Sequence, residues 1–136
     1  MRRPWPPLLV LALAVGACSE DDSASSGDGE ATEFCGRLDR LARNDPFGAF
    51  GNRATPAEIQ QAFTALVSRA GDLLEVAPAE ARPAARDYAE AAAELDSLMA
   101  GAAYDGSVVD SRAYREQQVA YTGAAGRLER HLETEC

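Results

Sequence analysis

The stretch YREQQVAYTGAAGRLERHL, residues 114–132, decides the fold of this chain. Its uncharged residues recur at alternating spacings of four and three, which is typical of a helix that buries one seam against neighbouring helices. The seam consists of Tyr114, Gln118, Tyr121, Ala125, Leu128 and Leu132. Asp110 or Ser111 stands in front of the stretch as an N-cap. We therefore expect a helix that ends at Cys136 and that needs partner helices to cover its seam.

Two further helical patterns lie in the first half of the chain. The first covers residues 32–43, and its apolar positions are Phe34, Leu38 and Leu41. The second begins at residues 55–58, Thr-Pro-Ala-Glu, which form a capping box with proline in the first helical position. It runs to about Glu75, and its apolar face consists of Ile59, Phe63, Leu66, Ala70 and Leu73.

A third pattern connects this segment to the last helix. It begins near Pro78 or Pro83, because proline is tolerated only in the first turn of a helix. Its inner face consists of Tyr88, Ala92, Leu95, Leu98 or Met99, and Ala102. Alternating β-branched residues are scarce throughout the chain. The sequence therefore predicts an all-α domain of four helices.

The chain opens with an export signal. Two arginines precede LLVLALAVGA, residues 8–17, which is too short to cross a bilayer as a helix, since that needs about 20 residues. Val15-Gly16-Ala17-Cys18 resembles the lipobox of bacterial lipoproteins. The resemblance implies that Cys18 carries a diacylglycerol, becomes the mature N-terminus and anchors the protein to the extracytoplasmic face of the cell membrane. The alternative is an ordinary secretory signal with an incidental cysteine.

The chain has three cysteines, an odd number for an exported protein. Lipidation accounts for Cys18 and leaves Cys35 and Cys136, which we expect to form a disulfide outside the cytosol. In an up-down-up-down bundle, an even number of helices brings the first helix start and the last helix end to the same pole. The expected fold is therefore an all-α, up-down-up-down four-helix bundle with one disulfide. The alternatives are two free thiols, or a Cys136 that pairs between chains.

The segment that follows Cys18 has the composition of a disordered linker. SEDDSASSGDGEA, residues 19–31, contains five acids, four serines and two glycines, and no basic residue. The expected organisation is a signal peptide over residues 1–17, the lipidated cysteine and linker over 18–31, and the helical bundle over 32–136.

Charge excludes some classes of partner. Loss of residues 1–17 leaves 11 basic residues, all arginine, against 22 acids, a net charge of −11. Such a chain lacks the basic patches that nucleic-acid binding requires, and it does not lie flat on an anionic membrane. Abundant Ala, Arg and Gly without lysine is typical of a GC-rich genome, and together with the lipobox it indicates an actinobacterial lipoprotein. The oligomeric state stays open.

The chain after the signal peptide offers little catalytic chemistry. Its single histidine, His131, shares a helix face with Glu135, but two ligands are too few for a metal site. No nucleophile motif or phosphate-binding glycine loop appears. We therefore expect no metal, no cofactor and no enzymatic activity. A carboxylate-based envelope hydrolase is the least favoured alternative, because paired acids such as Glu90 and Glu94 are most simply an exposed helix surface.

Two features point to where the domain binds. The loop NDPFGAFGN, residues 44–52, carries Phe47 and Phe50 at the pole opposite the disulfide, where they either contact a partner or cap the open end of the core. Gly123 and Gly126 interrupt the last helix at a cost of about 1 kcal/mol each. Either close packing against Ala91–Ala93 offsets that cost, or a kink opens a ligand groove.

These observations favour a non-catalytic binding or interaction module of the cell envelope, held by a lipid anchor and contacting an envelope protein. The alternative is a carrier of a lipid or small apolar ligand, in a cavity between the third and fourth helices.

Overall fold

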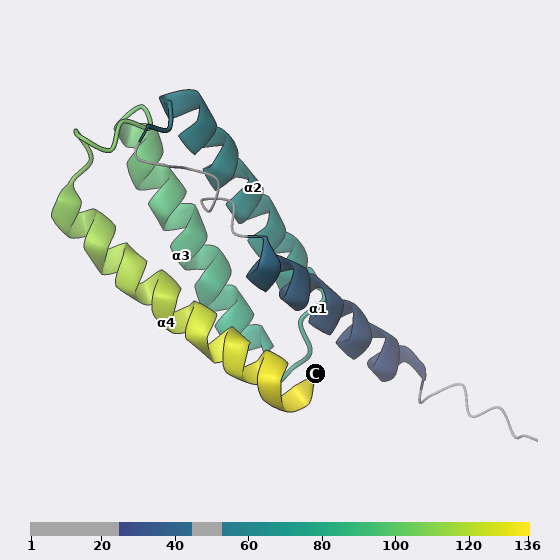
Figure 1. The fold of residues 1–136 in the computed structure, drawn as a ribbon. Helices are drawn as coiled ribbons and strands as arrows, with labels where there is room; N and C mark the ends of the chain where they lie inside the picture. Colours follow the sequence, from purple (N-terminus) through teal and green to yellow (C-terminus); the bar gives the residue numbers. More distant parts are fainter. Residues whose placement is uncertain (1–24, 45–52) are drawn as a thin grey trace, which may run out of the picture.

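The protein folds into four helices, in a computed structural model that describes residues 25–44 and 53–136 (Figure 1). The helices are α1 (Ser25–Arg43), α2 (Pro56–Glu75), α3 (Arg82–Gly101) and α4 (Ser111–Glu135), and the two described ranges contain no strand. Successive helices run in opposite directions. The prediction of an all-α, up-down-up-down four-helix bundle is confirmed.

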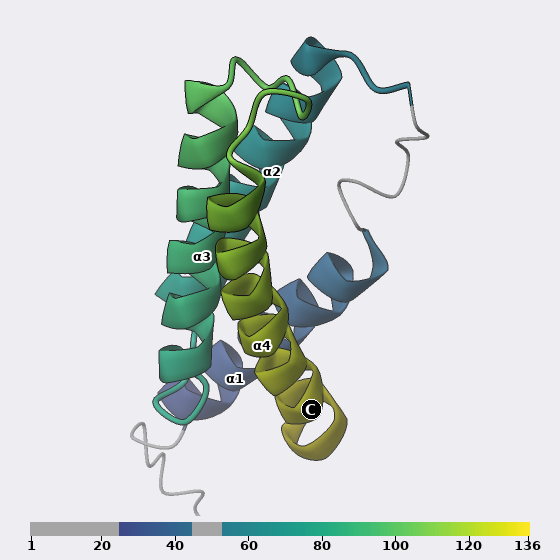
Figure 2. The same ribbon diagram turned by 90° about the vertical axis from the view of Figure 1, so that its left-hand side faces the viewer.

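The four helices do not pack equally. α3 packs extensively against both α2 and α4, whereas α1 makes fewer contacts with α2 and α4. No Cα atom of α2 lies within 8 Å of a Cα atom of α4. Figure 2 shows that α1 is inclined to the other three helices and diverges from α4 toward its own C-terminal end. Among the described residues, α1 therefore covers the furrow between α2 and α4 near one pole of the bundle and diverges from it toward the other.

α1 begins at Ser25, seven residues before the expected start at Thr32. The predicted start of the first helix at Thr32 is therefore wrong, because residues 25–31 belong to this helix. No proline lies between Cys18 and Asp45. A helix that is nucleated around Phe34 can extend toward the N-terminus, because each added residue gains a backbone hydrogen bond at little further cost.

The core is formed by apolar side chains from all four helices, and none of the buried residues in the described ranges is polar or charged. Its largest fully buried side chains are Phe34, Leu66, Leu73 and Leu128. The apolar faces predicted for the first three helices are confirmed at their central positions, such as Leu38, Phe63 and Tyr88. Burial of each large side chain contributes about 1.5–3 kcal/mol.

The helix starts follow the predicted signals. Thr55 caps α2, and both hydrogen bonds of the capping box with Glu58 are present. Pro83 lies in the first turn of α3, so the later of the two predicted starts is confirmed. Asp110 caps α4 and accepts hydrogen bonds from the amides of Arg112 and Ala113.

Cys35 and Cys136 form a disulfide, with 5.7 Å between their Cα atoms. The pairing within one chain is confirmed. Cys35, however, lies in the middle of α1 rather than in its first turn, because that helix begins at Ser25. The N-terminal part of α1 therefore extends past the point where the last residue of the chain is attached (Figure 1).

The seam predicted for α4 is only partly buried. Leu128 is buried, Tyr121 and Leu132 are half-buried, and Gln118 is exposed, whereas Ala124 beside the seam is fully buried. The mean spacing of these six positions equals the 3.6 residues of one helical turn, so the seam runs straight along one side of α4. The inclination of α1 then leaves the N-terminal half of this seam without a second partner.

α3 does not lie close to the two glycines of α4, Gly123 and Gly126. A Cβ atom added at Gly123 would meet only the Arg127 guanidinium of its own helix, at 3.9 Å. The same holds for Gly126, where the nearest such atom belongs to Arg130, at 3.8 Å. Close packing against α3 is therefore the wrong explanation. α4 continues as one helix through both positions, and nothing in the structure explains these glycines.

Replacing both Cys35 and Cys136 by serine should lower the free energy of unfolding by about 4 kcal/mol, because the disulfide closes a loop of about 100 residues. Denaturant unfolding followed by circular dichroism measures the difference. The parent chain treated with a reductant is the control and should lose the same amount. A loss below about 1 kcal/mol in both samples would show that the disulfide does not stabilise the bundle.

Replacing Gly123 or Gly126 by alanine should raise the free energy of unfolding by about 1 kcal/mol each, because alanine favours the helix and the added methyl group meets no obstacle. Thermal and denaturant unfolding test this directly. The matched control is Ala120→Gly at an exposed position of the same helix, which should lose a similar amount. A destabilised Gly123→Ala variant would mean that α3 approaches α4 more closely than described.

Candidate functional site

An apolar groove of about 700 Å³ opens at the pole of the bundle opposite the disulfide. Three helices, the connection between α3 and α4, and Ala54 just before α2 contribute to its walls. Ile59 and Phe63 come from α2, Met99 from α3, Val109 from the connection between α3 and α4, and Tyr114 and Arg115 from α4. Its volume lies within the range of about 300–1,000 Å³ that is usual for small-molecule sites.

The groove exists because α1 diverges. Near the disulfide, Leu38 and Leu41 of α1 cover the side chains of Tyr121 and Leu128 and leave a hollow of only about 170 Å³. Tyr121 and Tyr88 also share a hydrogen bond of 2.8 Å between their hydroxyl groups there. Tyr114 lies two turns nearer the start of α4. Figure 2 shows that α1 has diverged from this part of α4. Within the described ranges, Ile59 of α2 and Tyr114 of α4 thus keep part of their surface accessible at this pole.

The connection between α3 and α4 is held in a strained backbone conformation beside the groove. Ala103 and Tyr104 have φ angles of 52° and 58°, in the left-handed region that costs residues with a Cβ about 1–2 kcal/mol each. Tyr104 is fixed there by three contacts: its amide donates to the carbonyl of Met99 (2.7 Å), its hydroxyl donates to Asp96 (2.9 Å), and its ring packs on Phe63. Strain of this kind is often found at functional sites.

Burial, together with the hydrogen bond to Asp96, raises the pKa of Tyr104 above its usual value. Burial also raises the pKa of Tyr114 in the groove wall. Both phenols therefore stay protonated at neutral pH and can donate hydrogen bonds. Asp105 and Glu58 behave oppositely, because hydrogen bonds from Ser107 and Thr55 lower the pKa of their carboxyl groups. These two acids stay ionised. Asp105 stabilises the turn with Ser107, and Glu58 belongs to the capping box of α2.

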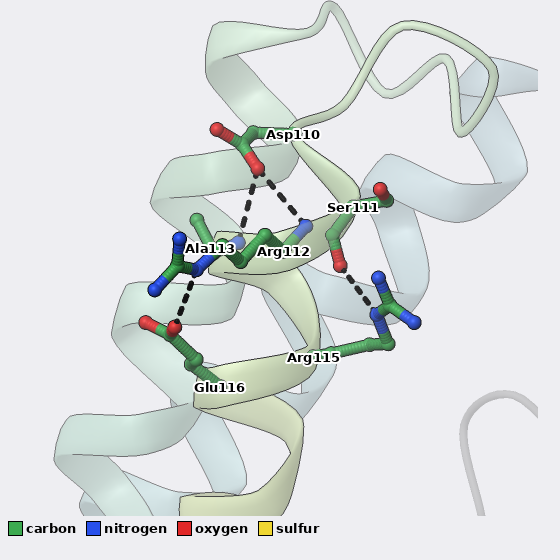
Figure 3. A network of polar contacts seen from close by, with 6 residues as sticks. All are labelled: Asp110, Ser111, Arg112, Ala113, Arg115 and Glu116. Carbon is green, nitrogen blue, oxygen red and sulfur yellow. Dashed lines mark hydrogen bonds and ion pairs between the residues drawn. The ribbon is translucent and has the colours of Figure 1, made fainter.

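Arg112 and Arg115 lie in the first turns of α4, and Figure 3 shows their side chains on two sides of the helix. Arg112 donates from Nε to Glu116 at 3.1 Å, so its charge is paired. Arg115 donates from Nε to the carbonyl oxygen of Ser111 at 3.0 Å and forms no ion pair with any described acid. Arg115 is thus positioned at the groove with its terminal guanidinium nitrogens available.

The hollow between α3 and α4 differs from the apolar cavity that the carrier alternative predicts there. Its volume is about 670 Å³, but Asp87, Glu90, Glu94 and Arg127 line it together with small residues. Asp87 and Arg127 form an ion pair of 2.6 Å across it. The apolar groove lies instead at the end of the bundle, whereas the hollow between α3 and α4 mixes charged residues with small and uncharged ones.

The other expected site residues have simple structural surroundings or lie outside the described ranges. His131 is half-buried and packs its ring edge-on against Phe34, with 5.4 Å between the ring centroids. No group of three His, Cys, Asp or Glu side chains in the described ranges is arranged to bind a metal. Cys18, Phe47 and Phe50 lie outside the described residues, so their predicted roles remain predictions.

Sequence patterns identified part of the groove. Ile59, Phe63, Met99 and Tyr114 were assigned to buried helix faces, whereas Val109 and Arg115 were not singled out. No local signal distinguishes Arg115 from the other surface arginines of the chain. Its place in the groove follows from the inclination of α1, which no short sequence pattern encodes.

Comparisons with models of known families, with curated proteins and with solved structures found no match to this chain. None of the four helices within the described ranges is both long and apolar enough to span a membrane.

Proposed function

We propose that the protein is a lipoprotein of the bacterial cell envelope, anchored through Cys18 to the extracytoplasmic face of the cell membrane, and that its helical domain is a non-catalytic binding module. The lipobox-like sequence supports the anchor. The binding site in this proposal is the apolar groove formed by Ile59, Phe63, Met99, Val109, Tyr114 and Arg115. The least favoured alternative remains a carboxylate-based hydrolase.

The observation that carries the proposal is the position of the groove relative to the attachment of the chain. The start of α1 at Ser25 and the C-terminus at Cys136 lie at one pole, where the disulfide joins α1 to the end of α4. The groove opens at the other pole. A protein held by its N-terminus would thus present the groove away from the membrane, where an envelope partner or ligand has access.

A second candidate function is that of a carrier for a lipid or a small apolar molecule. The apolar lining and the volume of about 700 Å³ favour it. In this alternative the ligand occupies the groove at the end of the bundle, rather than a cavity between α3 and α4. The two candidates share the site and differ in the occupant.

Replacing Cys18 by alanine should release the protein from the membrane fraction, because the sulfur that would carry the lipid is lost. Cell fractionation and metabolic labelling with a clickable fatty acid measure the release and the loss of lipid. Ser19→Ala is the matched control and should stay membrane-bound and labelled. Retention of the Cys18→Ala variant in the membrane fraction would refute the lipid anchor.

A photo-crosslinking residue placed at Val108, in intact cells, should form a discrete adduct, because this side chain is 65% exposed in the connection next to the groove. The control position is Val119, which is 73% exposed but lines the hollow between α3 and α4. Gel shifts and mass spectrometry identify the adducts. Equal crosslinking at both valines, or none at Val108, would argue against the groove as the binding site.

A further inference from the structure

We infer that the ligand of the groove is a single-chain amphiphile with an anionic head group, whose chain lies along the apolar wall and whose head pairs with Arg115. This inference rests on the proposed function of the groove as a binding site and adds the chemical class of the ligand. Three properties of the groove support it: the distribution of its apolar side chains, the charge of its lining and the fixed position of its arginine.

The apolar part of the groove is a continuous wall from the floor to the mouth. Phe63 and Met99 are almost fully buried and form the floor, whereas Ile59 and Val109 are half-buried nearer the mouth. Such a wall can shield a hydrocarbon chain from water, at a gain of about 0.8 kcal/mol for each buried methylene group. It offers few hydrogen-bonding groups, so it suits a chain better than a sugar or a polar peptide.

The lining of the groove differs in charge from the chain as a whole, which carries a net charge of −9. Arg115 is the one charged group among the described residues that line it. At physiological ionic strength, charges further away than about 8 Å are largely screened. The guanidinium of Arg115 is therefore the group in the lining that can pair with an anionic head group. The acids that adjoin lining residues, Glu58, Asp105 and Asp110, bind Thr55, Ser107 and the first amides of α4.

Arg115 is held in place for such a contact. Its Nε donates to the carbonyl oxygen of Ser111, which leaves the Nη groups as donors for a carboxylate or phosphate. Figure 3 shows Arg115 on the side of α4 opposite to Arg112 and Glu116, so the nearby acid does not neutralise it. The cap residue Asp110 already occupies the amides of Arg112 and Ala113, which leaves Arg115 as the principal anion-binding group. Tyr114, protonated at neutral pH, can add a hydrogen bond.

The test uses the purified full chain with methyl-labelled methionine and four amphiphiles of equal chain length. The chain has only two methionines, and Met99 lines the groove, so its methyl signal reports on occupancy. The probes are dodecanoate and dodecyl phosphate as anions, dodecanol as the neutral reference and dodecyltrimethylammonium as the cation, each below its micelle concentration. The two anions distinguish a carboxylate from a phosphate head.

We expect saturable shifts of the Met99 signal, with the better anion bound at least about tenfold more tightly than dodecanol and the cation bound most weakly. Arg115→Gln should remove the preference for the anion and leave the affinity for dodecanol unchanged. Arg112→Gln is the matched control on the same helix, and it should keep the preference.

The outcomes separate the inference from the proposed function. Equal affinities for dodecanol and both anions, or an anion preference that survives Arg115→Gln, would overturn the inference and leave the groove as an apolar binding site. If no amphiphile shifts Met99, while the Val108 crosslink in cells contains a protein, the inference fails and the binding module stands. If neither experiment shows occupancy, both fail.

Discussion

The disulfide between Cys35 and Cys136 is the constraint on which the arrangement of this bundle depends. α1 has fewer contacts than the other helices, and its buried side chains, Phe34 and Leu38, lie close to the bridge. The covalent link therefore holds α1 against α4 at the point where it is packed. Beyond that point α1 is free to follow its own direction, and it diverges from the furrow between α2 and α4.

The groove is the direct consequence of this divergence. A four-helix bundle normally buries the apolar faces of all its helices along their whole length. Here the faces of α2 and α4 remain partly open at one pole, and Phe63, Met99 and Tyr114 form a wall there. The strained connection at Ala103 and Tyr104, and the pinned guanidinium of Arg115, lie at the same pole. Apolar surface, backbone strain and one positive charge thus coincide.

Much of the fold could be predicted from short sequence patterns. The capping box at Thr55 and Glu58 set the start of α2, and Asp110 set that of α4, because caps act within one turn of a helix. The predicted start of α1 was wrong by seven residues. No recognised capping motif or proline in the sequence marks the start of this helix, and helix extension depends weakly on composition. The glycines of α4 were also misinterpreted, because the distance between two helices cannot be inferred from residue size alone.

The sequence by itself determined the number of helices, the side of each that faces the core and the pairing of Cys35 with Cys136. These properties depend on periodicity, on capping chemistry and on the count of reversals along the chain, all of which are local or topological. The tertiary structure alone decided the angle at which α1 crosses α2 and α4. That angle results from many weak packing contacts along whole helices. The angle of α1 explains why Arg115 lines an apolar groove, while Arg112, one turn away, is paired with Glu116.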